Sequence, residues 1–208
     1  MTETAPPYVS VHDEPMHRFR FRNEYVFVYD VGIPPSAVTL YHSHDEDSLY
    51  VAINGVHCCT QDLGQEPVTS QIEKGTIMVA PFRSRPLIHQ VTNVGREEMR
   101  MIGAEILASP PVTAAAPLSA PGVTLLAEKP RIRTYRIALA PGESTGDLAC
   151  DFSGILIVMA GHALEIAGRE TRSLSIAPGD AIWHDGPLVQ RLTNPGREPF
   201  EAVLGEWR

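Results

Sequence analysis

Three histidines are the residues of this sequence best suited to chemistry. His42 and His44 are separated by one residue, and His89 lies in a later run that begins at Gly75. Residues two apart on a β-strand project from the same face, so His42 and His44 can direct both imidazoles toward one point. Another strand can bring His89 to that point, and three imidazoles suit a divalent metal ion. The histidines therefore predict a metal site within a β structure.

The elements that must position these histidines are short strands. Runs of β-branched and aromatic residues recur along the chain, and Gly and Pro separate them. The clearest runs are residues 25–32, 48–55, 75–81, 154–161 and 174–183. Short strands divided by turn residues are typical of an all-β barrel or sandwich with little helix.

The sequence also repeats itself. Residues 33–55 align with residues 139–161 without a gap, and residues 91–99 align with residues 192–200. This repetition predicts a duplicated β-barrel. Between the copies lies a Pro- and Ala-rich segment, which we expect to be extended and exposed. The predicted organisation is an N-terminal arm, a first barrel, a linker and a second barrel, at residues 1–24, 25–108, 109–122 and 123–208.

Composition and charge narrow the classes of function. The chain has 208 residues, 43% of them hydrophobic, and a formal net charge of −8. Without a basic run to contact phosphates, nucleic acid is not an expected partner. The sequence shows neither a signal peptide pattern nor a long apolar run, so we predict a cytoplasmic protein that does not interact with membranes. Its three cysteines, Cys58, Cys59 and Cys150, fit no disulfide framework and no Cys-rich zinc site, and we expect them to be reduced and buried.

The arrangement of these residues resembles the cupin superfamily, and specifically its two-domain members, the bicupins. The residues that match the first cupin motif are Gly32, His42, His44 and Gly55, and those that match the second are Gly75, Pro81, His89 and Asn93. The resemblance covers both halves of the chain. It implies two tandem cupin barrels, also called jelly rolls or double-stranded β-helices, with one divalent metal ion in the N-terminal barrel. It also implies a homodimer and an arm that can add a strand to a neighbouring barrel.

One departure from the cupin pattern concerns the fourth metal ligand. The position of the family's glutamate is occupied by Ser48, which leaves three histidines. Cysteine dioxygenase and acetylacetone dioxygenase are cupins similar in holding Fe(II) with three histidines. A three-imidazole set leaves more open positions for a chelating ligand. The alternatives are that water or substrate fills the fourth position, or that Glu46 or Asp47 turns in as a ligand.

A second departure concerns the C-terminal half. At the positions of His42, His44, Ser48 and His89 the second copy has Leu148, Cys150, Gly154 and Gln190. These residues cannot bind a metal of the same kind, so we expect a structural or dimer-forming barrel, or one that binds something else. His184, which lies between Trp183 and Asp185, is interpreted as a turn or surface residue.

Other residues complete the predicted site. Arg83 and Arg85 lie in an insertion before His89 and are predicted to bind substrate, because a guanidinium captures a carboxylate in bidentate fashion. Tyr50, like His42 and His44, has an even residue number, so it is predicted to project from the same strand face. Tyr50 and Glu46 are the candidate catalytic residues for proton transfer. Metal binding is not expected at His12 or His17 in the arm.

Three classes of function follow. The favoured one is a mononuclear non-haem Fe(II) dioxygenase that acts on a small chelating organic substrate, such as a carboxylic acid. The second is a redox-neutral isomerase, lyase or hydrolase in which Zn²⁺, Ni²⁺ or Mn²⁺ polarises a carbonyl. The third is a non-catalytic cupin that binds a small molecule.

Overall fold

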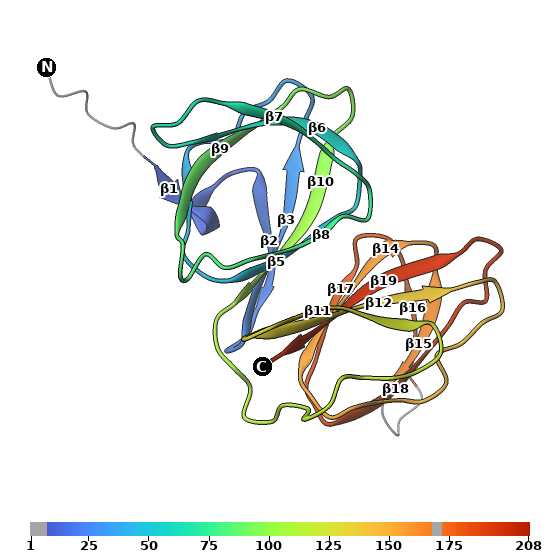
Figure 1. The fold of residues 1–208 in the computed structure, drawn as a ribbon. Coiled ribbons are helices and arrows are strands. Elements are labelled where there is room, and N and C mark those ends of the chain that lie inside the picture. Colours follow the sequence, from blue (N-terminus) through green and yellow to red (C-terminus); the bar gives the residue numbers. More distant parts are fainter. Residues whose placement is uncertain (1–7, 168–171) are drawn as a thin grey trace, which may run out of the picture. The chain divides into compact units, whose positions relative to one another are not determined.

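The chain folds into two compact β units, the first ending at Leu107 and the second beginning at Ala108. The structure, a computed structural model, describes residues 8–167 and 172–208, and side chains outside residues 164–174. Within the described residues, no helix is long and apolar enough to span a membrane. Figure 1 shows the strands, which are coloured from blue at the N-terminus to red at the C-terminus.

The first unit consists of two five-stranded sheets. Their strand orders are β1-β4-β9-β6-β7 and β2-β3-β10-β5-β8. A short 3₁₀ helix, η1 (Val11–Asp13), follows the first strand. The strands are β1 (Val9–Ser10), β2 (His17–Arg22), β3 (Val26–Ile33), β4 (His42–His44), β5 (Ser48–Ala52), β6 (Val56–Asp62), β7 (Val68–Ile72), β8 (Ile77–Ala80), β9 (Leu87–Asn93) and β10 (Met99–Ile106).

The second unit consists of a five-stranded and a four-stranded sheet. Their strand orders are β11-β12-β19-β14-β17 and β13-β18-β15-β16. The strands are β11 (Val123–Lys129), β12 (Ile132–Leu139), β13 (Leu148–Cys150), β14 (Gly154–Ala160), β15 (Ala163–Ala167), β16 (Arg172–Ile176), β17 (Ala181–His184), β18 (Leu188–Thr193) and β19 (Phe200–Trp207). A turn with Gly179 at φ 89° separates β16 from β17, so the predicted single strand at 174–183 is two strands.

The two units repeat one topology. Each strand from β2 to β10 has a counterpart from β11 to β19 in the same sheet position, and β1 is an addition to the first unit. The pairing of β4 with β9 places His42 opposite His89, and the pairing of β13 with β18 places Leu148 opposite Gln190. The duplicated all-β architecture predicted from the sequence is confirmed.

A buried asparagine explains one of the repeated sequence segments. The Asn93 side chain donates to the carbonyls of Ile33 and Glu97, and its oxygen accepts from the amide of Gly95. Asn194 makes the same three bonds in the second unit, to Leu139, Glu198 and Gly196. Both asparagines are fully buried. Each satisfies backbone groups that would otherwise be buried without partners, which is costly.

The cores of the two units differ in how they are filled. A row of three residues crosses the neighbouring strands in each unit: Tyr29, Gly103 and Tyr50 in the first, and Tyr135, Leu204 and Leu156 in the second. In the second unit all three pack into a hydrophobic cluster with Leu148, Cys150 and Phe152.

The N-terminal arm belongs to the first unit. Strand β1 pairs in parallel with β4 at His42 and Ser43, and β2 pairs with β3. The buried carboxylate of Glu14 accepts hydrogen bonds from the amides of Met16 and Leu40. The arm therefore adds strands to its own barrel, whereas the resemblance implied that it could join a neighbouring one.

The Pro- and Ala-rich segment lies along the second unit. Ala114, Leu118 and Ala120 pack partly buried against its hydrophobic cluster. The backbone amide of Leu118 donates to the hydroxyl of Tyr135, and the carbonyl of Ala114 accepts from Arg133. The segment has no regular secondary structure and is mostly exposed, but these contacts tie it to the rest of the second unit.

Replacing the buried asparagine of the second unit should be strongly destabilising. We expect Asn194→Ala to lower the free energy of unfolding by about 3 kcal/mol, because it removes three hydrogen bonds and leaves buried backbone groups without partners. The chain's two tryptophans, Trp183 and Trp207, both lie in this unit, so tryptophan fluorescence during urea unfolding reports on it. Thr124→Ala, at an exposed residue, is the control. An equal effect of both substitutions on the free energy of unfolding would contradict the stabilising role of Asn194.

Candidate metal centre

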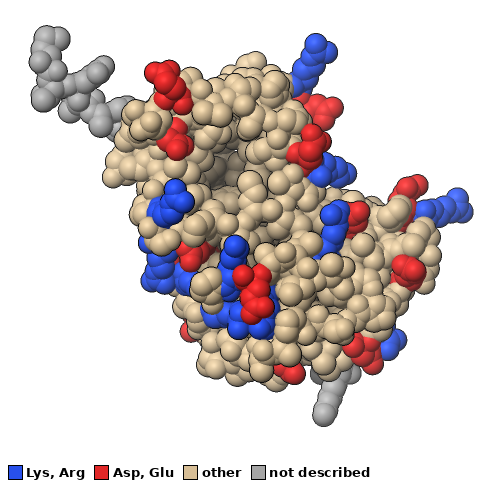
Figure 2. Space-filling model, viewed as in Figure 1, with Lys and Arg blue, Asp and Glu red and all other residues tan. Residues whose placement is uncertain are grey.

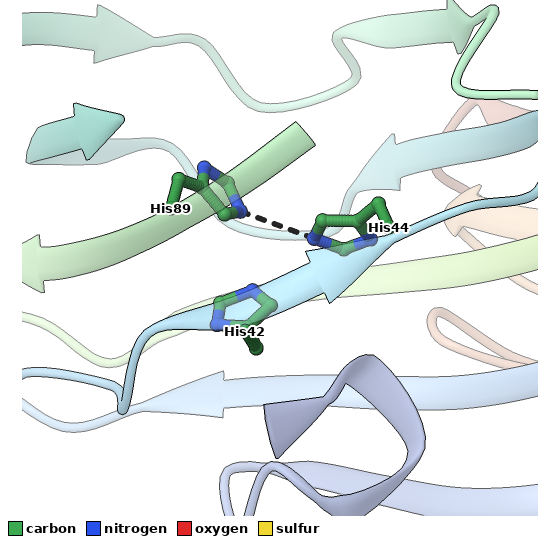
Figure 3. Close-up of side chains that lie close together, drawn as sticks. All are labelled: His42, His44 and His89. Atoms are coloured by element: carbon green, nitrogen blue, oxygen red, sulfur yellow. Dashed lines mark hydrogen bonds between the residues drawn. The ribbon is translucent and has the colours of Figure 1, made fainter. Parts of the chain in front are cut away.

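His42, His44 and His89 meet inside the first unit. One ligand atom from each lies within 4.8 Å of the others. The ring centroids are 4.6 Å apart for His42 and His89, 4.9 Å for His42 and His44, and 5.0 Å for His44 and His89. Figure 3 shows the two imidazoles from β4 and the one from β9 facing a common centre. The strand geometry predicted from the i, i+2 spacing therefore brings these residues together.

Hydrogen bonds orient the rings. Nδ1 of His42 donates to the carbonyl of Leu40 at 2.9 Å, which leaves Nε2 of the neutral ring with a free lone pair. Nε2 of His44 lies 3.1 Å from Nε2 of His89, and Nδ1 of His44 lies 3.0 Å from the hydroxyl of Tyr50. Nδ1 of His89 is buried and has no hydrogen-bond partner. These contacts direct Nε2 atoms toward the shared centre.

A glycine allows two tyrosines to support His44. Gly103 lies between Tyr29 and Tyr50 across three neighbouring strands. A Cβ atom at Gly103 would come within 2.5 Å of the Tyr29 ring, so only glycine leaves room for that ring. The hydroxyls of Tyr29 and Tyr50 are 2.8 Å apart, and this contact extends the chain of hydrogen bonds from His44. A buried histidine is thereby fixed in place by partners outside the centre.

Burial keeps the imidazoles neutral. It lowers the pKa of His44 to about 2 and that of His89 to about 3, with a further contribution from neighbouring imidazoles. Burial also lowers the pKa of His42. Because a metal ion binds the unprotonated imidazole, this electrostatic environment favours metal binding at neutral pH.

The three histidines lie at a cavity of about 400 Å³, within the usual size range for small-molecule sites. Its walls are mostly apolar, and the sulfur-containing residues Met78, Met99, Met101 and Cys58 contribute to them. Phe82 stacks on His44 with ring centroids 4.9 Å apart. Figure 2 shows a hollow in the surface of the first unit.

The donor set fits a divalent cation. Three neutral nitrogens converge on one point, and among the described residues theirs is the one cluster of this kind. Ser48 is buried, and its hydroxyl donates to the carbonyl of Glu46. The Glu46 carboxylate lies 3.8 Å from Arg83, and the Asp47 carboxylate accepts from the Arg83 backbone amide. Three ligands leave coordination positions for an exogenous molecule.

The other residues predicted for the site are divided between the cavity and the surface. Tyr50 lines the cavity, whereas Glu46, Arg83 and Arg85 are not among the described residues that line it. The side chain of Arg83 is 57% exposed and Arg85 is also exposed. The predicted roles of Tyr50 in proton transfer and of the arginines in substrate binding stay predictions.

A fourth histidine in the cavity was missed by the sequence analysis. His17 on β2 lines the cavity, and its ring lies 4.8 Å from that of His42, edge to face. It is not one of the three residues of the metal cluster. The available signal was the alternation of His17, Phe19 and Phe21, which is typical of a strand, but the pairing of the arm with β3 could not be inferred from it.

The second unit has no equivalent centre among its described residues. Leu148 and Cys150 lie in the hydrophobic cluster, and Nε2 of Gln190 donates to Sγ of Cys150 at 3.3 Å. His184 is buried at the end of β17, so its interpretation as a turn or surface residue was wrong. His184 is buried because the pairing of β17 with β14 places it opposite Gly154, on the inward face of the sheet. Cys58 and Cys150 are buried free thiols, as expected, while Cys59 is partly exposed.

Two jelly-roll barrels in tandem, one with three histidines directed inward, define the bicupin fold, in agreement with the resemblance found in the sequence. Comparison with solved structures supports this assignment. AerE from Microcystis aeruginosa matches with a TM-score of 0.62 and 13% identity, over 94% of this chain and 98% of that chain. Salicylate 1,2-dioxygenase from Pseudaminobacter salicylatoxidans matches with a TM-score of 0.66 and 14% identity, over 91% of this chain and 75% of that chain.

The comparisons by sequence add no relative. No protein-family model matches the chain, and no curated protein matches it significantly. A structure of the same salicylate 1,2-dioxygenase with gentisate matches with a TM-score of 0.63 and 14% identity, over 88% of this chain and 68% of that chain. At these identities the likeness establishes the fold.

Substitution of each histidine tests the centre. His42→Ala, His44→Ala and His89→Ala should each remove stoichiometric metal, because two imidazoles bind a divalent ion too weakly to retain it through gel filtration. Elemental analysis of untagged protein gives the metal content, and circular dichroism checks the fold. Gln190→Ala and Cys150→Ala are the matched controls in the second unit, and loss of metal in either control would contradict the assignment.

Acid should destabilise the first unit through these histidines. The pKa of His44 is about 2 in the folded chain, whereas an unperturbed histidine has a pKa of 6.5. The unfolded chain therefore binds more protons as pH falls below 6.5, and stability is lost toward lower pH. In chelator-treated protein, we expect His44→Gln to reduce the slope of unfolding free energy between pH 7 and pH 5 by up to ~1.4 kcal/mol per pH unit. Equal slopes would argue against a neutral, buried His44.

Proposed function

We propose that this protein is a metal-dependent oxygenase, a mononuclear non-haem Fe(II) dioxygenase that acts on a small chelating organic compound. The observation that carries the proposal is the convergence of three neutral imidazoles on one side of an apolar cavity. A structural metal site is normally closed by four protein ligands, whereas a catalytic site keeps positions open.

The residues of the chain have distinct parts in this proposal. His42, His44 and His89 would hold the metal ion, which would supply the redox chemistry with O₂ that protein side chains lack. Tyr50, through its contact with Nδ1 of His44, fixes the orientation of that ring. Phe82 stacks on the imidazole of His44 and would help to exclude water from the metal centre.

The apolar walls support an organic substrate with a hydrophobic body. Such walls stabilise a ligand in proportion to the apolar surface that they remove from water. Salicylate 1,2-dioxygenase, a dioxygenase with the same fold, has been solved with gentisate, an aromatic carboxylate. A substrate of this chemical kind is therefore part of the proposal. The prediction that Arg83 or Arg85 binds its carboxylate is the alternative to binding of that carboxylate at the metal centre.

A redox-neutral metal enzyme is the second candidate. The same three imidazoles suit Zn²⁺, Ni²⁺ or Mn²⁺ in a Lewis-acid role. Tyr50 lines the cavity, and its hydroxyl is the candidate group for proton transfer to a substrate. Burial raises the pKa of Tyr50 well above its usual value, so the hydroxyl would act as an acid or a hydrogen-bond donor.

Oxygen uptake tests the proposal. Protein reconstituted anaerobically with Fe(II) should consume O₂ when given a substrate from a panel of aromatic hydroxy acids, β-diketones, thiols and small keto acids. His42→Ala should lose the activity by at least ~100-fold, because removal of a ligand should cost more than removal of an outer-shell partner, while Gln190→Ala should keep it.

Other results point to other functions. Turnover without O₂ in the presence of zinc, nickel or manganese would favour the redox-neutral enzyme. Thermal stabilisation by a ligand without any turnover would favour a non-catalytic binding protein. Stoichiometric iron with no substrate-dependent uptake of O₂ across the panel would contradict the dioxygenase proposal.

A further inference from the structure

The N-terminal arm contributes a side chain to the cavity of the first unit. His17 lines the cavity together with the three histidines of the metal centre. Its ring stacks on Tyr29 with centroids 5.1 Å apart, and it lies 6.4 Å from the ring of His44. The position of the ring is therefore fixed by aromatic neighbours beside the metal centre.

The hydrogen bonding of His17 defines what it can offer a ligand. Nδ1 lies 3.3 Å from the backbone carbonyl of Val11. A carbonyl only accepts, so Nδ1 carries the proton, and Nε2 of the neutral ring is left as an acceptor. Among the described residues, no hydrogen bond to Nε2 of His17 is made, so this acceptor is available to a molecule in the cavity.

The charge of the cavity limits the ligand further. Neither lysine nor arginine is among the described residues that line it, and the one carboxylate among them is that of Asp62, an exposed residue opposite His89 in the pairing of β6 with β9. A negative charge away from the metal centre would be desolvated without a cation to compensate it, which is costly. A single negative charge at the histidine end, by contrast, can be balanced by the metal ion.

We propose that His17 is a ligand-binding residue whose Nε2 accepts a hydrogen bond from the substrate, and that this substrate has an apolar body, at most one negative charge, and an N–H or O–H group beside its metal-binding atoms. The inference rests on the proposed metal centre, because that centre places the charged end of the ligand next to His17. It assigns a binding role to the arm, which the sequence had not indicated.

A pair of hydroxamates separates the hydrogen bond from chelation. Benzohydroxamate chelates a metal ion as a monoanion and keeps an N–H group, whereas N-methylbenzohydroxamate chelates in the same way without that donor. With zinc-loaded protein, calorimetry should show benzohydroxamate binding roughly tenfold more weakly to His17→Leu than to the wild type, the effect of one lost hydrogen bond. N-methylbenzohydroxamate should bind both proteins equally, and His17→Gln should recover part of the loss.

Control measurements distinguish the outcomes. His57→Leu, at an exposed histidine of β6, should leave both affinities unchanged. If His17→Leu weakens the binding of both hydroxamates equally, or of neither, the proposed hydrogen bond to Nε2 of His17 is overturned. Loss of zinc from His17→Leu would show that His17 contributes to metal binding, and would overturn its assignment as a residue that binds only the substrate. Failure of the wild type to bind zinc, iron or another divalent metal ion would overturn the proposed metal centre, and this inference with it.

The charge limit has its own test. 4-Carboxybenzohydroxamate differs from benzohydroxamate by a para-carboxylate, which adds a second negative charge to the apolar body. We expect 4-carboxybenzohydroxamate to bind wild-type protein at least tenfold more weakly than benzohydroxamate. Tighter binding would overturn the charge limit and would instead support capture of the carboxylate by Arg83 or Arg85.

Discussion

The antiparallel pairing of β4 with β9 is the constraint on which the site depends. It places His42 directly opposite His89, and the two-residue period of β4 adds His44 on the same face. Without this register, three imidazoles would have to be buried separately, and each would need its own hydrogen-bond partners. Within this register, the hydrogen bond from His42 to Leu40 and the contact of His44 with Tyr50 orient two of the three rings.

The same framework supports two different interiors. Asn93 and Asn194 bind equivalent backbone groups, and Tyr29 and Tyr135 occupy equivalent positions on β3 and β12. The difference lies next to these tyrosines. In the first unit Gly103 leaves space and Tyr50 supplies a hydroxyl group, whereas in the second unit Leu204 and Leu156 fill the interior. A few side chains therefore separate a candidate metal centre from a packed core, while the backbone topology is unchanged.

The arm extends the site beyond the two cupin motifs. Its register is set by the pairing of β2 with β3 and by the buried contacts of Glu14. A further contact joins Nε2 of His12 to the carboxylate of Glu105 at 2.6 Å, and Glu105 is almost completely buried. Burial raises the pKa of Glu105, while the hydrogen bond from His12 opposes that shift. These interactions hold the strand that brings His17 into the cavity.

Local patterns in the sequence determined the all-β class, the duplication and the three histidines, because strand periodicity and repeated turn residues are properties of neighbouring residues. Contacts between distant strands were decided only by the tertiary structure. His17 and Gly103 acquire their roles from pairing with β3, and His184 is buried because β17 faces inward opposite Gly154. Likewise, only the tertiary structure shows the ion pair between Glu46 and Arg83, whose predicted roles in catalysis and substrate binding stay predictions. Register between strands depends on how the whole barrel closes, and no local run of residues specifies it.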